Sequence, residues 1–175
     1  MTEQLTDTMV RTALWQQFSA AIDMLENAML ACSDMLWQEH LWIDGESEDE
    51  GTFWGITHHT LGCLEVFLTG CSEEDLPVFK KRSDGVIPKD ELHPYLVQLR
   101  QTCQATLAAL SEEKAHQMYA FQRPGGVTSS YFELLLYTLR HVQEHAAQLS
   151  LFLGQHAIPG DAIHWILRAK EETDL

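Results

Sequence analysis

Apolar residues recur at intervals of three and four along most of this chain, which is the spacing of one face of an α-helix. The first amphipathic segment runs from about residue 8 to residue 37, and its apolar positions are Leu14, Phe18, Ile22, Leu25, Met29, Cys32 and Leu36. A second segment covers Phe53–Leu68, with Thr52 placed to cap its start and Gly70 placed as its C′ residue. The pattern predicts two long helices in this part of the chain.

The second half of the chain repeats this pattern. A third helix is expected to begin at Asp90, and its buried stripe comprises Leu92, Leu96, Leu99, Cys103, Leu107 and Leu110. Ser130-Tyr-Phe-Glu133 matches a capping box and opens a fourth helix, for which Gly154 is the expected C′ residue. An irregular connection is expected between these two helices, since no hairpin pattern stands out there.

Four long helices without a competing strand pattern predict an all-α fold, a four-helix bundle formed by a single domain over residues 1–175. The segment of about residues 71 to 89 contains Pro77, Gly85 and Pro88 and is expected to be a long crossover loop. A short C-terminal extension, Ala162–Leu167, is expected to add a turn of helix after the bundle.

Net charge argues against a nucleic-acid partner. The chain carries 26 acidic and 11 basic residues, for a net charge of −15, and its basic cluster is Lys80-Lys81-Arg82. Binding to nucleic acid depends on clustered lysine and arginine. No stretch approaches the 18 apolar residues of a membrane span, and the first residues lack the pattern of a signal peptide, so we expect a cytoplasmic protein that binds no membrane.

The four cysteines, at positions 32, 63, 71 and 103, include no Cys-x-x-Cys pair. Cys32, Cys63 and Cys103 fall within apolar helical patterns, where a reduced cysteine behaves as a small hydrophobic residue. The sequence therefore predicts neither disulfides nor a thiolate metal site.

His141-Val-Gln-Glu144-His145 is the most specific chemical feature of the sequence. Residues four apart on a helix point about 40° apart and lie one turn apart, so both imidazoles can reach one metal ion. A third imidazole is available at His58 or His59 in the second helix. Only one of those two can face the bundle interior, and the periodicity does not choose between them.

Three imidazoles would form an open catalytic site with a fourth position for water or substrate. They suit zinc, nickel, cobalt or iron, so the ligand type does not identify the metal. The simpler alternative is that these are ordinary core or surface histidines. The pair also matches H-x-x-E-H, in which Glu144 would act as general base of a metallopeptidase, but such enzymes need a further acidic ligand downstream. We therefore place Glu144 on the helix surface.

The segments Phe53–Leu68 and Leu134–Leu149 resemble the DinB-like superfamily of metal-binding helical bundles, which places one histidine in the second helix and an H-x-x-x-H pair in the fourth. This resemblance implies that His59, rather than His58, joins His141 and His145 as a metal ligand. It also implies a divalent metal, with zinc or nickel first and cobalt or iron as alternatives, and a homodimer. Ala146-Ala147-Gln148 departs from the His-Arg-Gly-Gln-like sequence of many members.

Members with assigned activities resemble thiol-dependent transferases and isomerases, and others are hydrolases, so we expect a transferase or hydrolase acting on a small molecule or thiol. The alternative is a non-enzymatic helical dimer or stress-associated binding protein. Gln148, one turn beyond His145, is a candidate for orienting a ligand imidazole. Tyr137 is either a donor to substrate or a core residue, Glu65 is expected at the surface, and Trp42 and Trp54 are expected to pack in the core.

Overall fold

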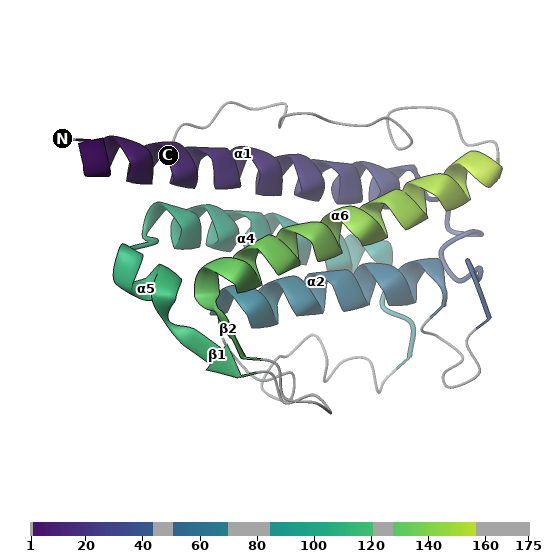
Figure 1. Cartoon of the computed structure of the whole chain (residues 1–175). Helices are drawn as coiled ribbons and strands as arrows, with labels where there is room; N and C mark the ends of the chain where they lie inside the picture. Colours follow the sequence, from purple (N-terminus) through teal and green to yellow (C-terminus); the bar gives the residue numbers. More distant parts are fainter. Residues whose placement is uncertain (1, 44–50, 70–84, 121–127, 157–175) are drawn as a thin grey trace.

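The computed structural model describes residues 2–43, 51–69, 85–120 and 128–156. Most of this part of the chain forms four long helices that lie side by side (Figure 1), namely α1 (Thr2–Ala31), α2 (Phe53–Thr69), α4 (Lys89–Ala108) and α6 (Tyr131–Gln155). Both α1 and α2 pack against α4 and α6, so α1 and α2 occupy opposite corners of the bundle. The predicted all-α four-helix architecture is confirmed.

The helices α1 and α6 run in one direction, and α2 and α4 run in the other (Figure 1). Consecutive helices with the same direction, such as α2 and α4, need a long crossover connection. Most of that expected loop, residues 70–84, lies outside the described residues, as do Cys71 and the basic cluster Lys80-Lys81-Arg82. The expected C-terminal extension Ala162–Leu167 also lies outside them. Among the described helices, none is both long and apolar enough to cross a membrane.

The core lies along the bundle axis and receives side chains from every long helix. The apolar positions of the periodic pattern are its main constituents, including Phe18, Leu25, Leu61, Cys103 and Val142, all fully buried. Burying an aliphatic or aromatic side chain of this size contributes about 1.5–3 kcal/mol. The predicted buried stripe of α4 is confirmed at each of its positions.

The first helix ends earlier than its apolar pattern predicted. α1 stops at Ala31, and the Ser33 carbonyl then accepts the backbone N–H groups of Leu36 and Trp37 at 3.0 and 3.1 Å. Leu36 and Trp37 are apolar because they pack on the core from this turn, not because the helix continues. Periodicity reports which residues are buried, and a compact turn can continue the stripe beyond the end of a helix.

The start of α2, the helix that carries His59, is held firmly by its neighbours. The backbone N–H groups of Phe53 and Trp54 donate to carbonyls of the preceding segment at 3.0 and 2.9 Å, and the N–H of Gly55 donates to Thr52 Oγ1 at 3.1 Å. The cap predicted at Thr52 is confirmed. Because the first N–H groups of a helix have no partner within it, these bonds fix where α2 begins and how it is oriented.

Gly51, just before this cap, has a structural reason to be glycine. A Cβ built at that position would lie 2.1 Å from the carbonyl oxygen of Trp42, closer than any real contact. The backbone of Leu41 donates to the Gly51 carbonyl at 2.8 Å, so the two chain segments meet closely here. Any larger residue would push the start of α2 away from its cap.

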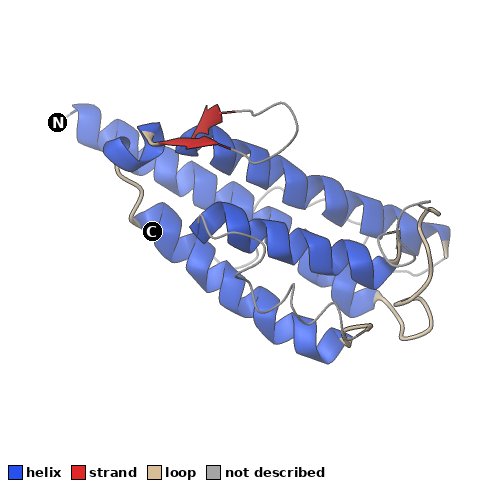
Figure 2. Ribbon diagram, turned by 90° about the horizontal axis from the view of Figure 1, so that it is seen from below, coloured by secondary structure: helices blue, strands red, loops and turns tan. Residues whose placement is uncertain are grey.

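The connection between α4 and α6 is more regular than predicted. It contains the short helix α5 (Glu112–His116) and an antiparallel pair of strands, β1 (Met118–Ala120) and β2 (Thr128–Ser130), at one end of the bundle (Figure 2). The expectation that no hairpin would form was wrong. Strands of three residues are too short to show an alternating pattern in the sequence.

The capping box that opens α6 is confirmed. Ser130 Oγ accepts the N–H of Glu133 at 3.2 Å, and the Glu133 carboxylate accepts the N–H of Ser130 at 2.9 Å. The predicted end is wrong, because Gly154 lies inside the helix and His156 is the C-cap. α6 therefore carries its histidine pair in the middle of a long, continuous helix.

Candidate metal site

The second helix is almost entirely buried, and His59 is one of its few half-buried positions. His58 is completely buried, and its ring packs against Trp54 with 6.0 Å between the ring centroids. His59 instead points across the interface between α2 and α6. His58 is thus the one buried in the interior, and His59 is the one that faces the histidine pair of α6.

The Nε2 atom of His141 contacts the Nε2 atoms of both His59 and His145. His59 Nε2 lies 3.2 Å from His141 Nε2, and His145 Nε2 lies 3.1 Å from the same atom. The ring of His59 also lies edge-on to that of His145, with 5.2 Å between the centroids. All three side chains are half-buried, so the cluster is held by the bundle and still reaches its surface.

Gln148 fixes the orientation of one imidazole. His145 Nδ1 donates a hydrogen bond of 2.7 Å to Gln148 Oε1, one turn further along α6. An amide oxygen can only accept, so the proton sits on Nδ1, and in the neutral ring Nε2 carries the lone pair. Gln148 therefore presents His145 Nε2 as a ligand atom toward His141.

Hydrogen bonds among the three Nε2 atoms cannot satisfy both contacts of His141. The His141 Nε2 atom contacts two other Nε2 atoms, and a neutral imidazole has a single N–H to share between them. A cation would satisfy all three lone pairs at once. In tetrahedral zinc sites with Zn–N bonds of 2.0–2.1 Å, ligand nitrogens lie about 3.3 Å apart. The two observed nitrogen–nitrogen distances are close to that value.

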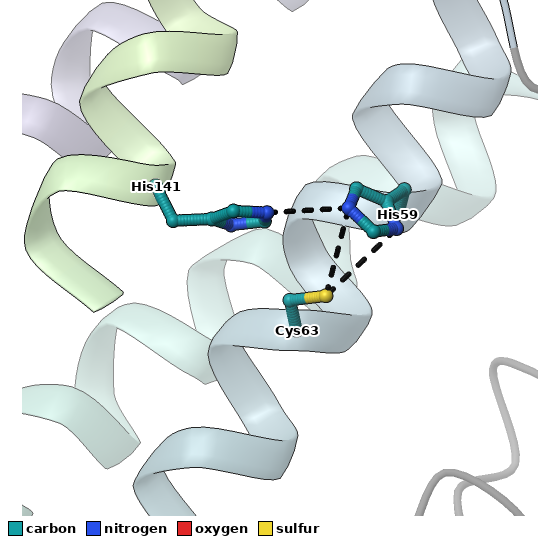
Figure 3. A group of neighbouring side chains, drawn as sticks. All are labelled: His59, Cys63 and His141. Atoms are coloured by element: carbon teal, nitrogen blue, oxygen red, sulfur yellow. Dashed lines mark hydrogen bonds between the residues drawn. The ribbon is translucent and has the colours of Figure 1, made fainter. Parts of the chain in front are cut away.

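Cys63 is a member of this cluster that the sequence interpretation missed. Its Sγ lies 3.7 Å from His59 Nε2 and 3.8 Å from His59 Nδ1, one turn further along α2 (Figure 3). The donor atoms of His59, Cys63 and His141 all lie within 4.8 Å of one another. The sequence predicts no thiolate metal site, whereas the geometry makes the Cys63 sulfur a candidate ligand beside His59 and His141. The signal was present in the sequence, because Cys63 follows His59 at the same four-residue spacing as His145 follows His141.

Comparison with known protein families agrees with this geometry. The model of the DinB superfamily matches residues 13–149, which include all four of these side chains. The chain belongs to the DinB superfamily. None of the curated proteins matches it. Membership in the DinB superfamily and the histidine–cysteine cluster together fit a metal-binding protein, and neither identifies the metal.

Aromatic side chains form one wall of the site in this DinB superfamily protein. The half-buried Tyr137 ring lies 5.9 Å from that of His141, and Phe67 meets Tyr137 edge-on at 5.5 Å. The Phe67 ring also approaches His141, with 6.3 Å between the centroids. These contacts restrict the His141 ring to orientations that face α2. Of the two tryptophans expected to pack in the core, Trp54 is fully buried, whereas Trp42 is 40% exposed, contrary to expectation.

The nearby carboxylates do not take part in the imidazole cluster. Glu144 is exposed on α6, as expected for a surface residue of the H-x-x-E-H segment. Glu65 is half-buried rather than at the surface, and it accepts a hydrogen bond from the Tyr95 hydroxyl of α4. Burial, together with this bond to Glu65, raises the pKa of Tyr95 well above its ordinary value. This pair joins α2 to α4 and stabilises the helix behind His59.

Proposed function

We propose that this protein is a metal-dependent transferase or hydrolase that acts on a small molecule, with His59, His141 and His145 as ligands of a divalent metal. The observation that carries this proposal is the contact of His141 Nε2 with the Nε2 atoms of both His59 and His145, which brings together imidazoles from two facing helices. Zinc and nickel are the first choices for such a ligand set, and cobalt and iron are compatible with it. Thiols are the first substrate class to test, because the resemblance that includes this ligand set implies thiol-dependent transfer.

The chain's own residues would prepare the site for such an ion. Gln148 holds the tautomer and direction of His145, and the aromatic wall of Phe67 and Tyr137 holds His141. The caps at its start hold α2, and hence His59, in position. A bound divalent ion would supply Lewis acidity toward a thiol or a water molecule.

Metal analysis of purified protein tests the site directly. We expect the wild type to bind one ion per chain and the double variant His59→Ala, His141→Ala to bind almost none. The matched control is His116→Ala, His156→Ala, which removes two exposed histidines and should retain the ion. Equal metal content in wild type and the site variant would contradict the proposal.

Activity requires a second experiment. A screen of thiol-transfer and ester-hydrolysis reactions with zinc, nickel, cobalt and iron should reveal turnover that depends on the metal. His145→Ala should abolish that turnover, while His156→Ala should leave it unchanged. Turnover that persists without added or bound metal would contradict the proposed chemistry.

A non-enzymatic metal-binding protein is the second candidate. The position of Glu144 favours it. Glu144 is the only acidic side chain between the paired histidines, and it is exposed. It is therefore not aimed into the imidazole cluster as a general base would be. Under this alternative the protein would bind the metal through the same histidines and show no metal-dependent turnover in the screen.

The same proposal includes a homodimer, which the resemblance implies, and the cytoplasmic location expected from the sequence. Light scattering coupled to gel filtration would measure its mass against the 19.9 kDa of one chain. A mass of one chain across the working concentration range would contradict the dimer without affecting the metal site.

A further inference from the structure

We propose that the Cys63 sulfur is a ligand of the same metal ion, so that the chain provides three nitrogen donors and one sulfur donor. This inference rests on the proposed metal site and extends it. The reduced protein would then hold its metal in a four-coordinate site made entirely of its own side chains. The histidines alone would leave the fourth position open.

Distances support this donor set. In a tetrahedral zinc site with Zn–S of 2.3 Å and Zn–N of 2.0–2.1 Å, a sulfur and a nitrogen ligand lie about 3.6 Å apart. Cys63 Sγ lies 3.7 Å from His59 Nε2. The nitrogen–nitrogen distances of 3.1 and 3.2 Å come similarly close to the value for two nitrogen ligands. These three distances are near those expected around one ion, and the donor atoms of His59, Cys63 and His141 all lie within 4.8 Å of one another.

The local structure holds Cys63 in this position. Cys63 is buried, with 3% of its surface exposed, and it lies on the α2 face that carries His59. Its side chain has a single rotatable bond, so the sulfur has few positions other than beside His59. In Figure 3 the sulfur and the His141 ring both approach His59, one along α2 and one across from α6.

The other two described cysteines differ from Cys63. Cys32 Sγ donates to the Ser33 carbonyl at 3.5 Å, and Cys103 is fully buried in the core. Burial raises the pKa of each of these thiols to about 12. Among the described residues, the group with metal-ligand geometry contains Cys63 and neither of them. They therefore serve as matched controls for cysteine substitutions.

A sulfur ligand changes what the site selects and how it reacts. Thiolate with imidazole suits zinc and cobalt(II) and disfavours hard ions such as magnesium or manganese. The thiol would release its proton to solvent as the sulfur binds the ion. An external substrate would then bind either as an additional ligand or by replacing the Cys63 sulfur.

Cobalt(II) provides a direct spectroscopic test, because a cobalt–thiolate bond gives a near-ultraviolet charge-transfer band that imidazole ligands lack. We expect the cobalt-loaded wild type to show this band, and Cys63→Ala and Cys63→Ser to lose it. Cys32→Ala, Cys71→Ala and Cys103→Ala should retain it. Loss of an orienting partner alone lowers metal affinity by about 10–100-fold, so loss of the sulfur ligand should cost at least about tenfold.

A second measurement needs no variant and so does not depend on how a substituted protein folds. X-ray absorption of the zinc-loaded wild type should show one sulfur neighbour at about 2.3 Å beside nitrogen neighbours at 2.0–2.1 Å. A shell of nitrogen and oxygen alone would overturn the role of Cys63. So would a cobalt charge-transfer band that survives in Cys63→Ala.

The outcomes separate this inference from the proposed function. Cobalt that binds to the wild type, is lost from the His59→Ala, His141→Ala variant and gives no charge-transfer band would overturn only the sulfur ligand. Cobalt that binds equally to wild type and to that histidine variant would overturn the proposed metal site itself. A band that requires both Cys63 and the histidines would support both.

Discussion

Two polar clusters lie on opposite interfaces of the bundle, and their contents differ in kind. Between α1 and α4, Arg100 donates to the Asp23 carboxylate, and its guanidinium lies 5.8 Å from the centroid of the Trp15 ring. Between α2 and α6, His141 Nε2 contacts the Nε2 atoms of His59 and His145, and the Cys63 sulfur lies beside His59. The first interface pairs opposite charges, whereas the second gathers groups that are all potential metal ligands.

This difference distinguishes a structural cluster from a binding site. The Asp23–Arg100 pair joins opposite charges, since the guanidinium offers only donors and the carboxylate only acceptors. The imidazole cluster brings nitrogen lone pairs close together. A cation shared by these nitrogens would satisfy them better than the few N–H protons of the rings. An oppositely charged pair stabilises the fold by itself, whereas a cluster of potential ligands fits a metal-binding protein.

The largest expected effect is on metal binding at the α2–α6 interface. His141→Ala removes the imidazole at the centre of the cluster, and we expect metal affinity to fall by more than about 100-fold, beyond the loss caused by removing an orienting partner alone. An ion present at about 100 times its Kd stabilises a folded protein by about 2.7 kcal/mol. Thermal unfolding with and without metal should therefore show a stabilising shift in wild type that disappears in the variant.

Arg100→Met provides the corresponding change at the α1–α4 interface. It leaves the largely buried Asp23 carboxylate without its main cation, and we expect about 2 kcal/mol of destabilisation, below the 3–5 kcal/mol for fully buried pairs. Denaturant unfolding would measure it, and the double variant Asp23→Asn, Arg100→Met should recover part of the loss. Metal affinity should stay unchanged, and a loss of metal in Arg100→Met would break the distinction between the two interfaces.

Gln148→Leu should weaken the site without removing a ligand. Without the hydrogen bond to Nδ1, His145 can adopt the other tautomer or turn away, and we expect metal affinity to fall by about tenfold. Competition with a chelator would measure this change. Gln148→Glu is the informative comparison, because a carboxylate also accepts from Nδ1 and should retain most of the affinity. Equal affinities in all three proteins would remove Gln148 from the site.

The sequence predicted the bundle well because regular apolar stripes mark the buried faces of its long helices, although α2 is buried on nearly all sides. The stripe of α4, the cap at Thr52 and the capping box at Ser130 were all found as expected. Errors occur where a run of buried residues continues beyond the end of a helix. Leu36 and Trp37 stay in contact with the core after α1 has ended. The hairpin of β1 and β2 was missed because backbone pairing over three residues leaves no side-chain pattern.

The candidate site was predictable only in part. The spacing of His141 and His145 follows from one helix, so the sequence alone brings them together. The choice between His58 and His59 depends on how α2 is rotated in the bundle, which periodicity cannot fix in a helix buried on nearly all sides. Cys63 was taken for a core residue because a buried thiol and a ligand thiol have the same sequence environment. The four-residue spacing from His59 and the distance of 3.7 Å between Cys63 Sγ and His59 Nε2 favour the ligand interpretation.

The smallest expected effect is on stability, at the first turn of α6, where Ser130 and Glu133 hydrogen-bond to each other. The carboxylate of Glu133 accepts hydrogen bonds from the backbone N–H and hydroxyl of Ser130, and these bonds lower its pKa below the ordinary value of 4.5. The unfolded chain therefore binds this proton at a higher pH than the folded protein does. The resulting stabilisation is present at neutral pH and is lost as the pH falls from about 4.5 through the lower pKa of the folded state.

Thermal unfolding across this acidic range should show a shallower decline of stability in Glu133→Gln than in wild type. Glu144→Gln, an exposed change in the same helix, should follow the wild type, and parallel curves for all three proteins would contradict a capping role for the charge.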